Sequence, residues 1–279
     1  MRIALLSDTH VSARAPECVA NWYAARRAIE RLRPDLTVHL GDVTLDGQSD
    51  PDEVPFAAAL ATKWPTRLRF IPGNHDVGDG SGEAPVDEEL LERYERYFGP
   101  DRWSVVADDW QLLGINAQLL GSGTAQEEAQ WRWLEGPAIA AAGARASALF
   151  LHRPLVRAVG DPKSDGRYVP PAAARRLLDG PLRATLRLVV SGHTHQYLDR
   201  VDAGVRHLWM PSSAFILPDR LQSRVGAKVV GIGVLGLSDD DVRVDLFCPD
   251  GMHRHDVSRL ALYERLAGRS QPEADAVRA

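Results

Sequence analysis

Short apolar runs alternate with amphipathic stretches along most of this 279-residue chain. Mostly apolar runs of strand length occur at 2–7, 36–40, 67–71, 147–151 and 185–190, and such runs are typical of strands buried on both faces. Apolar residues recur near helical spacing, or fill the gaps between turn signals, at about 16–33, 52–63, 86–98, 125–141 and 171–179. The pattern therefore predicts that strands and helices alternate.

The chain becomes richer in strands towards its C-terminal end. Further strands are predicted at 196–201, 205–209, 227–236 and 241–247, and a hairpin at 103–107 and 110–115. Antiparallel strands added to a β-α framework suggest two mixed β-sheets packed face to face with helices outside. We predict an α/β fold with a single domain over residues 1–267 and a flexible polar tail over 268–279.

Composition limits the partners that the protein could bind and the cellular compartment in which we expect it. The net charge of −5 disfavours a nucleic-acid partner, which would call for a basic domain. No stretch approaches the ~18 apolar residues of a membrane-spanning helix. Residues 1–7 are interpreted as a strand beneath the site rather than as a removable signal peptide. Cys18 and Cys248 are expected to be free buried thiols, with a disulfide as the alternative. We therefore expect a cytoplasmic setting.

Five polar motifs each follow directly after one of the strand-like runs. They are Asp8-Thr9-His10, Gly41-Asp42, Gly73-Asn74-His75-Asp76, His152, and Gly192-His193-Thr194-His195. Ligands of open α/β sheets bind at the carboxyl edges of the strands, so these motifs are expected to converge. Mixed carboxylate and imidazole ligands suit Mn, Fe, Zn, Co or Ni better than Ca or Mg. The motifs predict a site for two divalent transition-metal ions.

In this order, the motifs resemble those of the calcineurin-like metallophosphoesterase superfamily, D-x-H, G-D, G-N-H-[DE], H and G-H-x-H. The resemblance runs from residue 3 to about 247. Size and spacing are most similar to bacterial class III cyclic-nucleotide phosphodiesterases and glycerophosphodiesterases. The resemblance implies a four-layer α-β-β-α sandwich with the metal site at the carboxyl edges of the strands.

The resemblance also implies a role for each motif residue. The metal ligands would be Asp8, His10, Asp42, Asn74, His152, His193 and His195, with Asp42 bridging the two ions. His75 would contact the phosphate and protonate the leaving oxygen, and Asn74 would help to bind the substrate. Asp76, the other candidate catalytic residue, would orient His75 or hold the loop. The implied nucleophile is a hydroxide that bridges the two metals.

Several residues near the motifs leave alternatives open. Arg153 could bind a phosphate oxygen or a substrate carboxylate, or it could be a surface arginine paired with an acid. Asn116 could hydrogen-bond a ligand histidine or belong to a plain turn, and His39 could be a core histidine or could touch the site. Tyr168 and Phe215 are candidates for stacking on a nucleobase.

These features predict an enzyme that hydrolyses a small phosphodiester, either a 3′,5′-cyclic nucleotide or a glycerophosphodiester. A phosphomonoesterase or a nucleotide or pyrophosphate hydrolase could use the same ligands and is the main alternative. A nuclease and a binding module without catalysis are less favoured, because the chain is acidic and every motif position is intact. The expected partner is a small phosphate ester, without nucleic acid or membrane, and both a monomer and a homodimer stay open.

Overall fold

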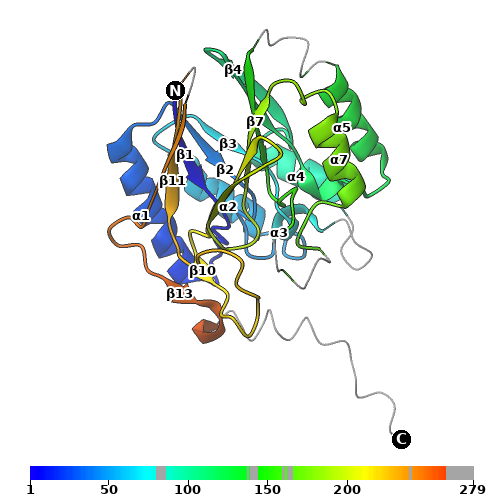
Figure 1. Ribbon diagram of the computed structural model, residues 1–279. Helices are drawn as coiled ribbons and strands as arrows, with labels where there is room; N and C mark the ends of the chain where they lie inside the picture. The colour runs from blue at the N-terminus through cyan, green and yellow to red at the C-terminus, as the bar shows by residue number, and fades with distance from the viewer. Residues whose placement is uncertain are drawn as a thin grey trace, which may run out of the picture.

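Two β-sheets face each other and carry helices on their outer sides, as the computed structural model shows (Figure 1). The structure describes residues 1–79, 86–136, 138, 144–158, 161, 166–238 and 241–261.

The first sheet has the strand order β12-β11-β1-β2-β3. Strands β1, β2 and β3 run parallel, whereas β11 and β12 are antiparallel additions at one side. The central strand β1 is almost wholly buried, which agrees with its continuous apolar run. The strands are β1 (Arg2–Leu6), β2 (Leu36–His39), β3 (Leu68–Phe70), β11 (Ile232–Leu237) and β12 (Val242–Phe247).

The second sheet has the order β4-β5-β6-β7-β9-β8. Its centre, β5-β6-β7-β9, is parallel, and the antiparallel strands β4 and β8 close the two edges. The strands are β4 (Trp103–Ala107), β5 (Trp110–Gly114), β6 (Ala146–Leu151), β7 (Leu186–Ser191), β8 (Leu198–Asp202) and β9 (Val205–Trp209). A separate pair joins β10 (Phe215–Ile216) to β13 (His255–Asp256).

Side chains cap the first turns of α4 and α5. Asp87 accepts a hydrogen bond from the backbone N–H of Leu90, and Thr124 accepts one from Glu127. Prolines occupy the first turns of two other helices, where the missing N–H has no cost. The helices are α1 (Pro16–Leu32), α2 (Glu53–Ala61), α3 (Asn74–Val77), α4 (Glu88–Phe98), α5 (Ala125–Glu135), α7 (Pro171–Asp179) and the 3₁₀ turns η1 (Ala117–Leu119) and η2 (Val257–Arg259).

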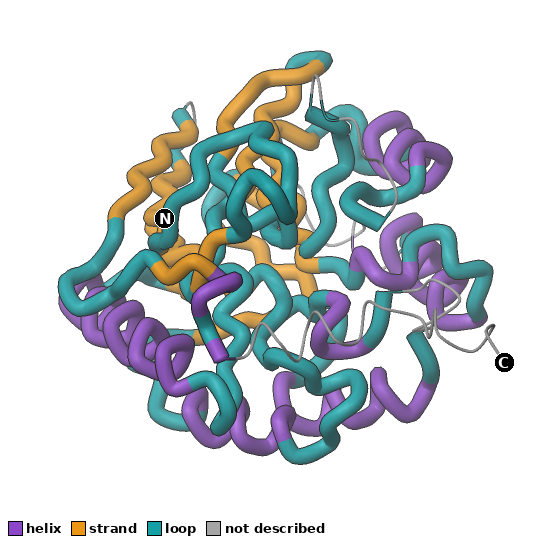
Figure 2. Tube along the Cα trace, turned by 90° about the horizontal axis from the view of Figure 1, so that it is seen from below, coloured by secondary structure: helices purple, strands orange, loops and turns teal. Residues whose placement is uncertain are grey.

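Three apolar clusters hold four layers of secondary structure together. A central cluster joins the inner faces of the two sheets, with Leu5 and Val38 from one and Phe150 and Val190 from the other. Helix α1 packs on the outer face of the first sheet, and α5 and α7 cover the outer face of the second. Viewed along a perpendicular direction, helices flank the central strands on both sides (Figure 2). The predicted α-β-β-α sandwich is confirmed.

Some predicted boundaries are wrong. The strand expected at 227–236 begins only at Ile232, and Ala227 instead forms an isolated bridge with Tyr197. The short helix α3 and the β10–β13 pair were not predicted, because two to four residues carry too little periodicity. The second half of the helix expected at 125–141 falls mostly outside the described residues, as does the tail over 268–279.

The two cysteines differ in burial. Both are free, which agrees with the prediction, but only Cys18 is buried and Cys248 is exposed. The expectation that both are buried is therefore wrong for Cys248, which follows the end of the edge strand β12. Within the described ranges, each helix is too short or too polar to cross a bilayer. The cytoplasmic setting stays a prediction.

The cysteines should react with a maleimide at very different rates in the folded protein. Burial raises the pKa of the Cys18 thiol to about 12, and the thiolate is the reactive form, so Cys18 should react at least ~10²-fold more slowly than Cys248. Mass spectrometry of timed samples would measure both rates, with Cys248→Ser isolating the buried thiol. Equal rates in the native protein would contradict the burial of Cys18.

Candidate metal centre

The predicted motif residues lie at one end of both sheets, because parallel strands bring their carboxyl ends to the same edge. Strands β1, β2 and β3 lead into Asp8, Asp42 and Asn74, whereas β6 and β7 of the other sheet lead into His152 and His193. The two halves of the site are joined across the sheets by hydrogen bonds. The backbone N–H of His193 donates to a carboxylate oxygen of Asp8 at 3.1 Å.

The backbone turns sharply where each ligand leaves its strand. Asp8, His10, Asp42, His193 and His195 all adopt positive φ angles, between 44° and 66°. This left-handed region is costly for residues with a Cβ, by about 1–3 kcal/mol each in strained functional sites. The turns aim consecutive side chains back over the strand ends, and the packed sheets hold them there.

Two glycines permit the close approach of these turns. A Cβ on Gly41 would lie 2.6 Å from Nδ1 of His152, and its φ of +93° is itself unfavourable for other residues. A Cβ on Gly192 would lie within 3 Å of both the Ser7 hydroxyl and the Asp8 carboxylate. The glycines in these motifs are therefore required by the geometry of the strand ends.

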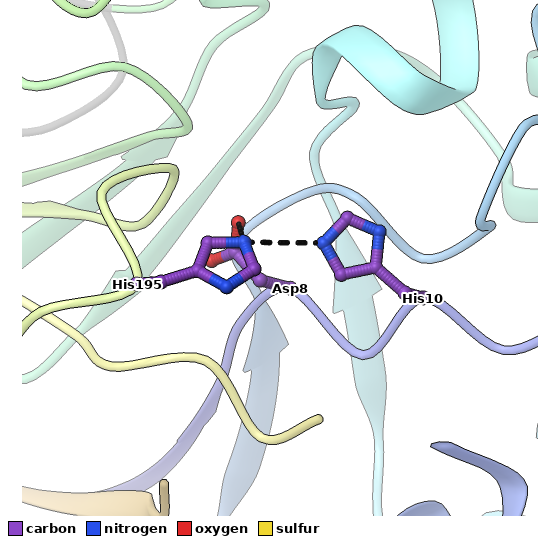
Figure 3. Close-up of side chains that lie close together, drawn as sticks. All are labelled: Asp8, His10 and His195. Carbon is purple, nitrogen blue, oxygen red and sulfur yellow. Dashed lines mark hydrogen bonds and ion pairs between the residues drawn. The ribbon is translucent and has the colours of Figure 1, made fainter. Parts of the chain in front are cut away.

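The first group of ligands comprises Asp8, His10 and His195, whose side chains point at one another (Figure 3). Nε2 of His195 lies 3.3 Å from a carboxylate oxygen of Asp8 and 3.2 Å from Nε2 of His10. All three side chains are at least 93% buried, since their exposed fractions do not exceed 7%. The two histidine rings thus present nitrogens to each other at short range.

The second group comprises Asp42, His152 and His193. Nε2 of His152 lies 3.2 Å from a carboxylate oxygen of Asp42 and 3.1 Å from Nδ1 of His193. The same oxygen of Asp42 lies 3.9 Å from Nε2 of His10 in the first group. Asp42 is therefore placed between the two groups, as expected of a bridging ligand.

Backbone carbonyls decide which nitrogen of each ring is free to face inwards. A carbonyl can only accept, so Nδ1 of His152 donates to Leu40, at 2.7 Å, and Nδ1 of His195 to Phe215, at 3.1 Å. Nε2 of His193 donates to Gly166 at 3.2 Å. In the neutral tautomers so selected, the opposite nitrogens have lone pairs directed at the other ligands.

The charges of the site favour a positive partner beside Asp42. Burial disfavours the ionised form of Asp42, but His152 and the neighbouring histidines outweigh it and hold the pKa of Asp42 well below its usual range. Burial and Asp42 likewise oppose each other at His152, and the carboxylate prevails, raising the pKa of that imidazole to about 9. Burial and the adjacent His75 lower the pKa of His10 to about 3. Positive charge is thus favoured beside Asp42, from a proton or from a cation.

The donor set fits divalent cations. Imidazole nitrogens that approach each other to 3.1–3.2 Å need a proton or a cation between them. Carboxylate oxygen Oδ1 of Asp8 and amide oxygen Oδ1 of Asn74 are buried, and neither accepts a hydrogen bond from any described residue. Buried oxygens of this kind are costly unless something else satisfies them, and a metal ion would do so.

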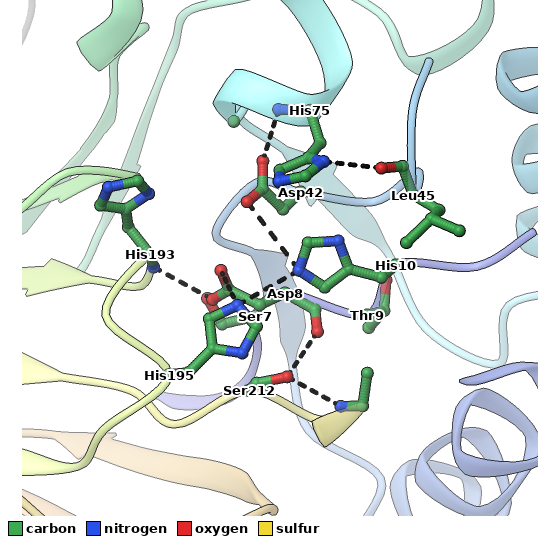
Figure 4. Close-up of polar contacts among 12 residues, drawn as sticks. Ser7, Asp8, Thr9, His10, Asp42, Leu45, His75, His193, His195 and Ser212 are labelled. Atoms are coloured by element: carbon green, nitrogen blue, oxygen red, sulfur yellow. Dashed lines mark hydrogen bonds and ion pairs between the residues drawn. The ribbon is translucent and has the colours of Figure 1, made fainter. Parts of the chain in front are cut away.

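His75 and Asp76 follow Asn74 on the short helix α3, and their contacts differ. The ring of His75 packs edge-on against His10, and its Nδ1 donates to the carbonyl of Leu45, so Nε2 stays free (Figure 4). Asp76 is buried and accepts hydrogen bonds from the backbone N–H groups of Val43, Thr44 and Gly73 and from the Thr44 hydroxyl. Of the two roles predicted for Asp76, its contacts support holding the loop, whereas Leu45 orients His75.

A cavity of about 340 Å³ opens beside the ligands. Asn74, His75 and His193 line it, together with Asp42, Gly166, Arg167, His195, Leu217 and Gln222. Its described lining includes Arg167, a residue that the sequence did not single out. The segment that brings Arg167 to the cavity carries no motif, so only the folded loop reveals it.

Arg153 directly follows the candidate ligand His152 and is buried. It is only 6% exposed, so it is not a surface arginine, and its Nη2 donates to the carbonyl of Asp79 at 2.6 Å. Burial lowers the pKa of its guanidinium. Contact between Arg153 and a substrate stays a prediction without support from the lining of the cavity.

The remaining candidates have clear positions. Asn116 caps η1 by accepting from the N–H of Gln118, which agrees with the turn alternative. His39 is buried and its Nε2 lies 2.8 Å from the Thr9 hydroxyl, so it supports the loop between Asp8 and His10. Phe215 stacks on the ring of His10, at 4.9 Å between centroids, and is 4% exposed.

Comparison with known proteins identifies the family. Residues 1–197 match the family described as calcineurin-like phosphoesterase, which is well over half of the chain. The chain belongs to the calcineurin-like phosphoesterases. The calcineurin-like chain is 31% identical over 130 residues to a protein of Moraxella catarrhalis (strain BBH18) named "Probable cyclic nucleotide phosphodiesterase". That match covers 43% of this chain and 45% of the relative, so it spans less than half the length of either protein.

Solved structures share the calcineurin-like fold at low sequence identity. A dimetal phosphatase from Danio rerio superposes with a TM-score of 0.61 at 14% identity, covering 88% of this chain and 95% of that one. The GAP50 protein of Plasmodium, titled the anchor in the inner membrane complex, gives 0.64 at 15% identity, covering 91% and 86%. At 14–15% identity, the likeness to these proteins is one of fold alone.

Asp76→Ala should destabilise the protein strongly, because four donors would lose their buried acceptor. We expect the free energy of unfolding to fall by about 3 kcal/mol or more, measured by urea denaturation. Asp76→Asn keeps one acceptor oxygen and should lose less.

Asp87→Ala is the matched control, since the carboxylate of Asp87 is an exposed helix cap and should contribute about 1 kcal/mol. An Asp76→Ala protein no less stable than this control would show that Asp76 does not hold the loop.

Proposed function

We propose that this calcineurin-like phosphoesterase hydrolyses a small phosphodiester at a site for two divalent transition-metal ions. The observation that carries the proposal is the close approach of imidazole nitrogens within each ligand group, at 3.1 and 3.2 Å, around the shared carboxylate of Asp42. Buried nitrogens this close to one another and to a carboxylate call for a proton or a cation between them.

Seven residues would hold the ions. Asp8, His10 and His195 form one set, His152, His193 and Asn74 the other, and Asp42 belongs to both. Bound divalent ions supply Lewis acidity to a phosphoryl oxygen and a water of low pKa at neutral pH. The imidazole and carboxylate donors suit Mn, Fe, Zn, Co or Ni.

The residues of the chain itself would position the phosphate and the departing group. His75 lines the cavity, and its Nδ1 is bound to the carbonyl of Leu45. When the ring carries a proton on each nitrogen, Nε2–H would donate its proton to the leaving oxygen. Arg167 lines the same cavity and would contact a phosphoryl oxygen. Asp76 would act as a positioning residue, because its bonds hold the loop that carries His75.

A diester is favoured over a monoester by the curated relative, whose name specifies a cyclic nucleotide phosphodiesterase. The phosphomonoesterase and the nucleotide or pyrophosphate hydrolase remain the alternatives, because they would use the same ligands. The deciding experiment loads metal-free protein separately with Mn, Fe, Zn, Co or Ni. Each form is then assayed on bis(p-nitrophenyl) phosphate, p-nitrophenyl phosphate and 3′,5′-cyclic AMP.

Turnover of a diester with at least one metal is the expected result. Turnover of the monoester alone would move the protein to the phosphatase alternative. Inactivity on all three substrates with both metals bound would contradict the proposal, and metal content should therefore be measured on the same samples.

Two substitutions should separate metal binding from proton transfer. Asp42→Ala should lose both metal and activity, because its carboxylate is shared by the two ligand groups. His75→Ala should keep both metals and lose rate on the order of 10²–10⁴-fold, as expected when a general acid is removed. Elemental analysis and steady-state kinetics measure the two effects. Equal metal loss in both variants would contradict the role proposed for His75.

A further inference from the structure

A second cavity lies next to the metal centre, between the segment after β6 and helix α7. Its volume is about 620 Å³, compared with about 340 Å³ for the cavity beside the ligands. Its walls are mainly apolar, formed by Leu155, Val156, Tyr168, Val169, Ala174 and Leu178. None of the candidate metal ligands lines it, so its chemistry is different from that of the metal centre.

Gly166 lies between the two cavities and lines both of them. Its carbonyl accepts the hydrogen bond from Nε2 of His193, so the wall between the cavities is fastened directly to a ligand histidine. A Cβ added to Gly166 would meet no heavy atom within 4 Å. The space directly over this exposed residue is therefore open.

The residues after Gly166 divide their side chains between the two cavities. Arg167 lines the cavity at the metal centre, whereas Tyr168 lines the apolar one. Both are held by the buried carboxylate of Asp161, which accepts from the Arg167 guanidinium and from the Tyr168 hydroxyl, the latter at 2.7 Å. One buried acid thus fixes the phosphate-facing and the apolar walls together, which is a built arrangement rather than a chance gap.

We propose that the second cavity binds a bulky non-polar substituent of the phosphate ester whose phosphate occupies the metal centre. The inference rests on the proposed function and deepens it by naming the substrate class. A non-polar substituent gains by leaving water for the apolar walls. A small polar alcohol such as glycerol gains little there, so the cavity selects against glycerophosphodiesters.

Charge at the second cavity narrows the class further. Arg157 and Arg175 contribute to its lining, and both are exposed. Two guanidinium groups repel a cationic substituent and tolerate a neutral or anionic one. The expected substrate is therefore a phosphodiester with a large, non-polar, uncharged or anionic group.

Binding of phosphonates to the Mn-loaded protein tests the inference, because their P–C bond is not an ester bond. Isothermal titration calorimetry would compare methylphosphonate, 1-naphthylmethylphosphonate and 2-aminoethylphosphonate. The naphthyl compound should bind at least ~10-fold more tightly than methylphosphonate, given the apolar area that it buries. The aminoethyl compound should show no gain.

Substitutions in α7 test whether the preference for the naphthyl compound arises in the second cavity. Ala174→Phe fills the cavity and should abolish the preference for the naphthyl compound while leaving methylphosphonate affinity unchanged. Ala172→Phe, on the exposed face of the same helix, is the matched control and should keep the preference. Should Ala174→Phe fail to fold, Val156→Asn makes the half-buried opposite wall polar and should reduce the preference instead.

The outcomes distinguish failure of the inference from failure of the proposed function. Equal affinity for the methyl and naphthyl compounds would overturn the inference and leave the phosphoesterase proposal standing. Lack of binding by every phosphonate and by inorganic phosphate would overturn both. Equally tight binding of 1-naphthylmethanol, which has no phosphonate, would show a separate ligand site and would also overturn the inference.

Discussion

The concentration of buried ligand atoms at the sheet edge is the constraint on which the rest of the structure depends. Two carboxylates, Asp8 and Asp42, and four imidazoles meet there, and all of them except His193 are buried. Removing such groups from solvent is expensive unless charges and hydrogen bonds are satisfied in place. The two sheets supply the ligands from opposite sides, and the cross-sheet hydrogen bond from His193 to Asp8 holds the two contributions in register.

Bringing the ligands together at the strand ends strains the backbone of the turns that carry them. Five ligands adopt left-handed backbone conformations, and the glycines beside two of them allow contacts that no other residue would permit. Isolated loops would relax from such conformations, so they depend on rigid surroundings. Asp76 provides part of that rigidity, because its buried carboxylate ties the loop after β2 to the loop after β3. Ligand geometry is therefore set by strand ends and by the residues that fasten them.

Whether a feature of the site can be predicted from the sequence depends on whether it belongs to a side chain or to the backbone. Apolar runs that end in Asp8, Asp42 or His152 can be recognised because burial and ligand type are properties of side chains. The carbonyls of Leu40, Leu45 and Phe215, which select the histidine tautomers, have no sequence signature, since every residue has a carbonyl. Arg167 has no sequence signature either, because its position depends on its bond to the buried carboxylate of Asp161, and a pattern of residue types does not reveal that bond. The strand predicted at 227–236 is too long because Val230 is apolar for a different reason, packing against helix α1.

The pairing of β1 with β11 has a consequence for the order in which the protein is made. Arg2 lies opposite Gly236 and Leu5 opposite Gly233, so the second strand of the chain's central pair is synthesised more than two hundred residues after the first. Until then, β1 exposes one unsatisfied edge, the kind of surface through which incomplete chains aggregate. A ribosome that stalls before Ile232 would thus release a chain whose motif residues have all been made but whose first sheet cannot close. A truncated chain would therefore tend to aggregate with other chains, in addition to losing catalysis.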